Sequence, residues 1–339
     1  MSKKLNYKIA TLGSHSALQI LKGAKDEGFG TIAICQKDRV EPYKSFPVAD
    51  EIIEVETFQD FFKIEKRLME ENAILIPHGS LVEFVGPENI EKIRMMHYGT
   101  KGIIKWETDR EKEREWLKKA DLNLPKLFKK PEDIDRPVII KFHGAGGGKG
   151  YFLAKTPEEF YERLKKYEGD KDKYVIQEYI VGVPLYSHYF YSVLNDELEI
   201  MSFDKRYESN ADSIGRIAAK DQLDVDIQTS YTISGNIPLV IRESLLPKVF
   251  EMGRKVVETS KQIEPGGLFG PFCLEAILDN HLNFYTFEVS ARIVAGTNPY
   301  SNGSPYTWLR YNEPMSTGRR MAREIKQAIE GGRLGEVLN

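Results

Sequence analysis

The stretch that most restricts the possible folds is residues 138–153, which read V-I-I-K-F-H-G-A-G-G-G-K-G-Y-F-L. Its β-branched start predicts a strand that ends at Lys141. A loop follows in which glycines are interrupted only by Ala145 and Lys149. Because glycine has no Cβ, such a loop can turn its backbone N–H groups toward an anionic ligand. Together with its two lysines, the loop is a candidate cradle for a polyphosphate.

The residues after this loop indicate which kind of phosphate site it forms. Tyr151 to Leu153 are strand formers, and helix-start signals appear only at Thr156-Pro157. The loop therefore joins strand to strand, whereas a Walker or Rossmann loop leads into a helix. A glycine-rich hairpin after a lysine-bearing strand is typical of the ATP-grasp enzymes. An ordinary glycine-rich surface turn is the alternative.

Length and charge limit the class of protein. The 339 residues predict two or three domains, and the composition, 41% hydrophobic and 29% charged, is typical of a soluble globular protein. A net charge of −3 gives no reason to expect a nucleic-acid partner. Cys35 and Cys273 stand in apolar runs and are expected to be buried thiols. With neither a signal peptide nor a membrane-length apolar run, we expect a cytoplasmic protein without a membrane partner.

The first hundred residues predict an open α/β unit. Strands are expected at 8–12, 31–36, 73–77 and 102–106, with a helix over 17–27. Polar turns follow two of these strands and carry His15 and Ser80. Since ligands bind at the carboxyl ends of strands in doubly wound sheets, these two residues are candidates for one shared site. The alternative for the first turn is an ordinary helix cap with an exposed histidine.

The remaining chain predicts a second, strand-rich part. Expected helices cover 108–120, 161–167 and 245–261, and expected strands cover 174–182, 189–194, 198–204, 272–278 and 283–289. The bulky residues of 174–182 could form a slot for a flat ring, with Glu178 accepting from an exocyclic amine. A solvent-facing strand end is the alternative for Glu178.

Two glutamates stand on the last predicted hairpin. Glu275 and Glu288 lie in the apolar contexts C-L-E-A-I and Y-T-F-E-V. Paired strands can bring such carboxylates within a few ångströms, where they repel each other unless a cation lies between them. Uncompensated carboxylates in apolar surroundings are costly, which favours a Mg²⁺ clamp over two exposed glutamates.

The order of these features resembles the ATP-grasp superfamily across most of the chain. It runs from a helix near Asp109-Arg110 through Lys141, the glycine loop and the bend Q-E-Y-I-V-G to the paired glutamates and Arg292. The sequence departs from the superfamily in two places. The usual Gly-x-Glu after the bend reads Gly182-Val183-Pro184, and Ser290 replaces the usual Asn two residues before Arg292. Ribose binding is therefore expected elsewhere, at Glu208.

Longer motifs resemble a narrower family. L-G-S-H-S-A-L-Q-I, P-H-G-S, F-D-K-R-Y-E-S-N, G-N-I-P-L-V-I-R-E-S-L-L and F-E-V-S-A-R-I-V-A-G-T-N are similar to the archaeal formate-dependent 5-formaminoimidazole-4-carboxamide ribonucleotide synthetases. The resemblance implies an α/β chain, α+β in its C-terminal part, with the ATP-grasp fold. An open parallel-sheet domain would cover 1–104, a small ATP-grasp subdomain 105–186, and the catalytic subdomain 187–339.

The resemblance also implies an activity and its residues. ATP, formate and aminoimidazole carboxamide ribonucleotide would give the N-formyl product, ADP and phosphate in purine biosynthesis, and the chain would form a homo-oligomer, a trimer or hexamer. The ribonucleotide would bind at His15, Ser80 and Asn236, the metal (Mg²⁺ or Mn²⁺) at Glu275 and Glu288, and catalysis would use Lys141, Lys149 and Arg292. ATP would bind Lys141, Gly146, Gly147, Gly148, Lys149, Gln177, Glu178, Tyr179, Ile180 and Glu208.

Two other functions stay open from the sequence. One is a different ATP-grasp ligase, which would share Lys141, Glu275 and Glu288 but differ at the ribonucleotide residues. The other is a non-catalytic ATP-binding paralogue, against which the intact lysine, loop and glutamates argue. A covalent formyl-enzyme is disfavoured because no Cys or Ser stands in a recognisable nucleophile motif.

Overall fold

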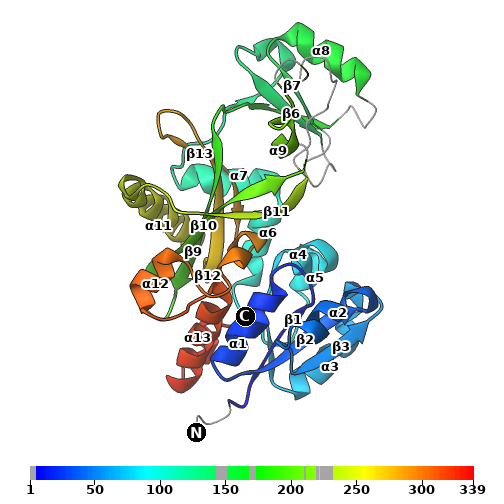
Figure 1. The fold of residues 1–339 in the computed structure, drawn as a ribbon, viewed down its shortest axis with the longest axis vertical. Coiled ribbons are helices and arrows are strands. Elements are labelled where there is room, and N and C mark those ends of the chain that lie inside the picture. Colours follow the sequence, from blue (N-terminus) through cyan, green and yellow to red (C-terminus); the bar gives the residue numbers. More distant parts are fainter. Residues whose placement is uncertain (1–4, 143–150, 168–172, 210, 219–220, 222–231) are drawn as a thin grey trace.

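The structure is a computed structural model that describes residues 5–142, 151–167, 173–209, 211–218, 221 and 232–339. It contains three sheets stacked along the long axis of the molecule (Figure 1). The N-terminal sheet lies at one end, a five-stranded sheet in the middle, and a small four-stranded sheet at the other end. The mixed α/β fold class predicted from the sequence is confirmed.

The N-terminal sheet is parallel, with strand order β3-β2-β1-β4. Its apolar central strands are buried on both faces, as expected for a parallel sheet covered by helices. The chain adds β2 and β3 on one side of β1 and then crosses to β4 on the other, so the order reverses between β1 and β4. The elements are β1 Lys8–Leu12, α1 Ala17–Asp26, β2 Gly30–Gln36, α2 Glu41–Ser45, β3 Glu51–Val55, α3 Phe61–Glu70, β4 Ala73–Leu75, α4 Gly79–Val85 and α5 Pro87–Ile90.

The strand predicted over 102–106 is wrong, because these residues belong to helix α6, Lys101–Thr108. Ile103 and Ile104 are both buried, while Lys105 and Trp106 are only partly buried. Glu107 also points inward, and the spacing 103, 104 and 107 is that of one helix face. Helix α7, Arg110–Lys119, follows directly and is capped by Asp109.

The middle sheet is antiparallel, with order β11-β10-β9-β12-β13. Helices α7, α11 and α13 pack against it, and its apolar residues share one continuous core with the N-terminal sheet. Its elements are β9 Val183–Ser192, β10 Glu197–Glu208, α9 Ala211–Ile214, β11 Ile233–Leu239, α11 Leu246–Ile263, β12 Gly270–Leu278, β13 Phe284–Ser290, α12 Pro305–Tyr311 and α13 Thr317–Glu330.

The small sheet has its own core, formed around Ile140, Phe142, Phe160 and Ile176. Its order is β5-β8-β6-β7, with β5 Leu127–Phe128, β6 Val138–Phe142, β7 Tyr151–Ala154, β8 Tyr174–Glu178 and helix α8 Pro157–Lys166. Strands β6 and β7 pair antiparallel, so the glycine-rich segment joins strand to strand as predicted. The predicted domain boundaries at 104 and 186 fall within α6 and β9, and the division stays a prediction.

Helices α1 and α13 touch backbone to backbone and attach the N-terminal sheet to the rest of the chain. A Cβ at Gly23 would lie 2.2 Å from the Arg319 nitrogen, and one at Gly318 would lie 2.3 Å from the Gln19 oxygen. Beside this contact the carboxylate of Glu27 accepts from Arg319 and Arg323 at 2.8 and 2.6 Å. Only glycine at both positions leaves room for this approach.

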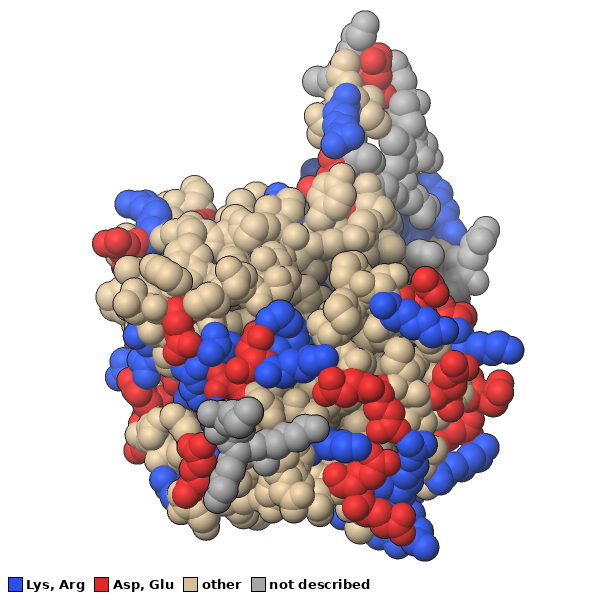
Figure 2. All heavy atoms as spheres, turned by 60° about the horizontal axis from the view of Figure 1, so that its bottom comes forward, with Lys and Arg blue, Asp and Glu red and all other residues tan. Residues whose placement is uncertain are grey.

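The surface and the thiols agree with the expectations from composition. Figure 2 shows acidic and basic side chains intermingled on the face nearest the chain start, without a large area of one sign on that face. Cys35 and Cys273 are buried and free. Among the described residues, every helix is too short or too polar to cross a membrane.

A buried arginine supplies a test of what holds α13 to the middle sheet. Arg320 donates to Glu199 at 2.9 Å and to Glu324 at 2.8 Å, and its side chain is 3% exposed. Replacing it with alanine leaves Glu324 without its cation and Glu199 with only the more distant Arg310, at 3.6 Å, so we expect R320A to lose about 3–5 kcal/mol of unfolding free energy in urea titrations.

Arg67 is the matched control, since it also joins two glutamates, Glu51 and Glu71, but is 54% exposed. We expect R67A to cost at most about 1 kcal/mol. Equal losses in the two variants would contradict the assignment of α13 anchoring to Arg320.

Candidate active site

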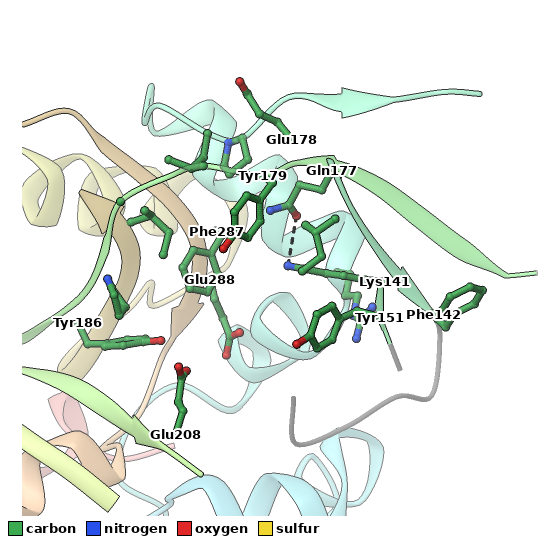
Figure 3. A pocket seen from close by; sticks show the side chains of 17 residues that line it. Lys141, Phe142, Tyr151, Gln177, Glu178, Tyr179, Tyr186, Glu208, Phe287 and Glu288 are labelled. Atoms are coloured by element: carbon green, nitrogen blue, oxygen red, sulfur yellow. Dashed lines mark hydrogen bonds between the residues drawn. The ribbon is translucent and has the colours of Figure 1, made fainter. Parts of the chain in front are cut away.

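The hairpin β12–β13 brings the two predicted glutamates together. Glu275 is the direct cross-strand partner of Glu288, and the register shifts immediately after this pair. Glu275 is 7% exposed and accepts a hydrogen bond from Arg206 at 2.6 Å, while Glu288 faces the neighbouring cavity (Figure 3). The hairpin therefore pairs the two glutamates as predicted, but Glu288 is exposed to the cavity whereas Glu275 is buried. Arg206, which the sequence did not predict, lies beside Glu275.

The charges at this pair fit a bound divalent cation. Burial, and then repulsion by Glu288, raise the pKa of Glu275 to about 8. Burial and Glu288 likewise raise the pKa of Glu113 to about 9. Oxygen ligands of like charge at such close range are the donor set that Mg²⁺ or Mn²⁺ neutralises. Among the described residues, no group of three or more histidine, cysteine or acidic side chains has metal-binding geometry, and the metal role of the pair stays a prediction.

Two buried glutamates from α6 and α7 hold the strand that carries Glu288 and leads to Arg292. Glu113 accepts from the N–H of Val289 at 2.8 Å, and Glu107 accepts from the N–H of Ala291 at 2.9 Å. Glu107 also pairs with Arg292 at 3.0 Å. These contacts were missed at the sequence level, although Glu113 lies on the same helix face as the buried Trp116 and Leu117. An acid on the apolar face of a helix was the available signal.

A cavity of about 440 Å³ opens between the small sheet and the middle sheet. Figure 3 shows Lys141, Tyr151 and Gln177 on one wall, with Tyr186, Glu208 and Glu288 opposite. Lys141 is near Gln177, 3.4 Å from Nζ to Oε1, and burial lowers the pKa of Lys141. The volume lies in the range of small-molecule sites. Its other described lining residues include Arg110, Tyr179, Ile180 and Phe287.

Glu178 does not aim its carboxylate into this cavity. Its oxygens accept from Arg136 Nη1 and from the Lys126 N–H, each at 3.0 Å, and the side chain points away in Figure 3. Residue 178 still lines the cavity together with Tyr179 and Ile180. The carboxylate is thus not placed to accept from a ligand amine, contrary to what the sequence led us to expect.

His15 and Ser80 come together at the point where the strand order of the N-terminal sheet reverses. The His15 ring stacks on His78 with centroids 5.4 Å apart, and a Cβ at Gly79 would lie 2.7 Å from His15 Nε2. His78 is buried, accepts from the Ser80 N–H at 3.2 Å and donates to the Leu12 carbonyl at 2.9 Å. His78 thus caps α4 and fixes Ser80 next to His15.

The charge around His15 suits an anionic or polar ligand. Desolvation by surrounding protein atoms lowers the pKa of His15, and His78, Arg292 and Arg206 act in the same direction, so the ring is neutral at pH 7. His15 is nevertheless an exposed residue, so a ligand can reach it. Asn236 is the third residue predicted to bind the ribonucleotide. It is the cross-strand partner of Arg206, so both side chains lie on the same face of the middle sheet.

Gly146, Gly147, Gly148 and Lys149 lie outside the described residues. Their predicted roles stay predictions, as do the roles of all the other predicted site residues. Arg206, Glu107 and Glu113 are the site neighbours that the sequence did not reveal.

Comparisons with known proteins cover almost the whole chain. Residues 156–339 match a domain of unknown function, DUF1297, and residues 9–128 match a protein family of unknown function, DUF1246. A protein of Pyrococcus horikoshii named 5-formaminoimidazole-4-carboxamide-1-(beta)-D-ribofuranosyl 5'-monophosphate synthetase is 56% identical, over 98% of this chain and 99% of its own. The Methanocaldococcus jannaschii protein of the same name is 48% identical, over 98% and 94%.

Comparison with solved structures confirms the ATP-grasp fold predicted from the sequence. The crystal structure of an IMP biosynthesis protein, PurP, from Thermococcus kodakaraensis has a TM-score of 0.78 at 32% identity, covering 98% of this chain and 100% of its own. N5-carboxyaminoimidazole ribonucleotide synthetase from Thermotoga maritima has a TM-score of 0.61 at 17% identity, covering 94% and 75%. The second likeness shows the fold alone.

The raised pKa of Glu275 predicts how stability depends on pH. The unfolded carboxyl ionises near pH 4.5 and the folded one near pH 8, so between these values the folded state holds a proton that the unfolded state has lost. Stability therefore falls as pH rises through this window, by up to about 1.4 kcal/mol per pH unit from Glu275 alone, and the raised pKa of Glu113 acts in the same direction. Unfolding of chelator-treated protein at pH 5.5 and 7.5 measures it.

Glu288→Gln removes the neighbouring charge and should reduce the loss of stability between pH 5.5 and 7.5 without abolishing it, because burial, the larger cause, remains. Added Mg²⁺ with the unchanged protein should also reduce it. An equally steep dependence in E288Q would show that the two carboxylates do not interact.

Proposed function

Because this chain belongs to the family of the archaeal 5-formaminoimidazole-4-carboxamide ribonucleotide synthetases, we propose that it catalyses the reaction of that name. ATP and formate formylate the amine of 5-aminoimidazole-4-carboxamide ribonucleotide, giving the formamido product, ADP and phosphate. The observation that carries the proposal is the near full-length identity to proteins of this name. The cavity with Lys141 and Glu288 on facing walls supports it independently.

The proposed chemistry begins with activation of formate. Formate is a poor acyl donor because its oxygen leaves badly, and attack of a formate oxygen on the γ-phosphorus gives formyl phosphate. Phosphoryl transfer depends mainly on positioning and charge neutralisation. We assign these tasks to Lys141, to Lys149 of the glycine segment and to Arg292, whose guanidinium is already oriented by Glu107.

The nucleotide would occupy the cavity between the sheets. Gln177 and the backbone of Glu178, Tyr179 and Ile180 would meet the adenine, Glu208 the ribose, and Gly146, Gly147 and Gly148 the phosphates. Glu275 and Glu288 would hold Mg²⁺ or Mn²⁺, which supplies positive charge beside the transferring phosphoryl group. In this arrangement Glu288 lies between the nucleotide and the N-terminal sheet.

The ribonucleotide would bind where the N-terminal sheet meets the middle sheet, at His15, Ser80 and Asn236. A neutral His15 can accept or donate one hydrogen bond, and Arg206 and Arg292 provide positive charge nearby. The aryl amine then attacks the formyl carbon and displaces phosphate. Excluding water from the cavity would protect the acyl phosphate during this step.

A different ATP-grasp ligase is the second candidate, favoured only by the general likeness to other ligases of this fold. It would turn over ATP with another acid and amine. A non-catalytic paralogue would bind ATP without turnover. We place the reaction in the cytoplasm with its co-substrate ATP, and expect a homo-oligomer, a trimer or hexamer, which light scattering measures.

Release of ADP in the presence of ATP, formate and the ribonucleotide, with each omitted in turn, tests the function. Formate labelled with heavy oxygen should deliver one label to the released phosphate, because the attacking oxygen stays on phosphorus while the amide keeps the other. Mass spectrometry of the phosphate measures it. Unlabelled phosphate with full product formation, after control for oxygen exchange with water, would mean that ATP activates something other than formate.

Substitution at the N-terminal sheet tests where the ribonucleotide binds. We expect His15→Ala and Ser80→Ala to weaken ribonucleotide binding at least ~10-fold, since each removes a polar partner, and to leave ATP binding unchanged. Titration calorimetry with both ligands measures this. His281→Ala, an exposed histidine in the β12–β13 turn, is the control. Unchanged ribonucleotide affinity in both test variants would remove this sheet from the substrate site.

A further inference from the structure

A buried carboxylate, Asp204, sits at the centre of a hydrogen-bond network that the proposed mechanism leaves unused. One oxygen of Asp204 accepts from His188 Nε2 at 2.7 Å, and the other accepts from Asn236 Nδ2 at 2.7 Å. Asp204 and His188 are 0% and 1% exposed. A Cβ at Gly296 would lie 2.3 Å from the Asp204 oxygen, so the backbone packs directly against this pair.

This network fixes which end of the Asn236 amide faces Asp204. An ionised carboxylate only accepts, so the amide must turn its NH₂ group toward Asp204 and its oxygen the other way. Asn236 is half-buried, and among the described residues none donates a hydrogen bond to that oxygen. The carbonyl oxygen is therefore a preset acceptor, and it stands on the strand position opposite Arg206.

The segment Ala295–Tyr300 connects this acceptor to the other ribonucleotide residues. Gly296 contacts Asp204, and two residues later Asn298 donates to the His15 carbonyl at 3.1 Å. Through this one short segment, Asn236 and His15 border the same region. A ligand there meets an acceptor whose direction is held by two fully buried side chains.

We propose that Asp204 and His188 are positioning residues that present the Asn236 oxygen to the carboxamide N–H of the ribonucleotide. This inference rests on the proposed function. The base of the substrate carries two groups with N–H donors, the amine and the carboxamide. The amine must stay free to attack the formyl carbon, which leaves the carboxamide for a fixed acceptor. The network thereby selects a carboxamide over a carboxylate at that ring position, since a carboxylate offers no N–H.

The donor and acceptor pattern allows a swap experiment. In Asp204→Asn, the new amide keeps its oxygen toward His188 and turns its NH₂ group toward Asn236. The Asn236 amide must then flip, so that its oxygen accepts from residue 204 and its NH₂ group faces the ligand. In the double variant D204N/N236D, the amide at position 204 donates to the carboxylate at position 236, and the second oxygen of that carboxylate again faces the ligand. The double variant restores every hydrogen bond and the net charge of the original pair.

Calorimetry compares three ribonucleotides: the carboxamide, its 4-carboxylate analogue, and the aminoimidazole ribonucleotide that has neither group. We expect D204N to weaken carboxamide binding at least ~10-fold and to shift preference toward the carboxylate by at least ~10-fold. Affinity for the third ribonucleotide and for ATP should not change, and D204N/N236D should regain the original preference.

The outcomes separate this inference from the proposed function. If the unaltered protein neither binds nor formylates the carboxamide, the proposed function fails. If it does both, then equal loss of all three ribonucleotides in D204N, or a double variant that keeps the D204N preference, overturns the positioning role. Should D204N not fold, the double variant decides alone, because it must fold and prefer the carboxamide.

Discussion

The hydrogen bonds from Val289 and Ala291 to Glu113 and Glu107 are the contacts on which the rest of the site depends. Strand β13 is the edge of the middle sheet, so its outward N–H groups have no neighbouring strand to bind. Two helical carboxylates take that place, and the same strand carries Glu288 and leads to Arg292. Burial raises the pKa of both Glu107 and Glu113, so the amide hydrogen bonds offset only part of the cost of burying these groups. The same hydrogen bonds fix the backbone between Glu288 and Arg292.

The region between the N-terminal and middle sheets is built from segments far apart in the sequence. His15 follows the first strand, Ser80 begins α4, and Arg206 and Asn236 face each other across β10 and β11. Gln19 on α1 contributes as well, donating to Thr297 at 2.7 Å. These are side-chain contacts to short polar loops, so small differences in loop sequence can change the ligand while the sheets stay the same.

The sequence predicted the parts whose signals are local. Strand periodicity located β6, β7 and the hairpin that pairs Glu275 with Glu288, and polar turns after strands located His15 and Ser80. It missed contacts between distant segments, such as Arg206 with Glu275, because no local pattern encodes them. Residues 102–106 were assigned to a strand because Ile103 and Ile104 are β-branched, and burial of one helix face overrode that preference. The sequence likewise did not show that the Glu178 carboxylate pairs with Arg136, because the two residues are 42 positions apart.

The close contact of α1 with α13 has a consequence for biosynthesis. Gly23 is translated early and Gly318 near the end of the described chain, yet each leaves room for the other helix. At ~5–20 residues per second, the ribosome needs roughly 15–60 seconds to cover that interval. The N-terminal sheet can form during this time, but the Glu27 carboxylate stays solvated until Arg319 and Arg323 have been synthesised. Docking of the first-made unit onto the middle sheet therefore cannot be completed until α13 has left the ribosome.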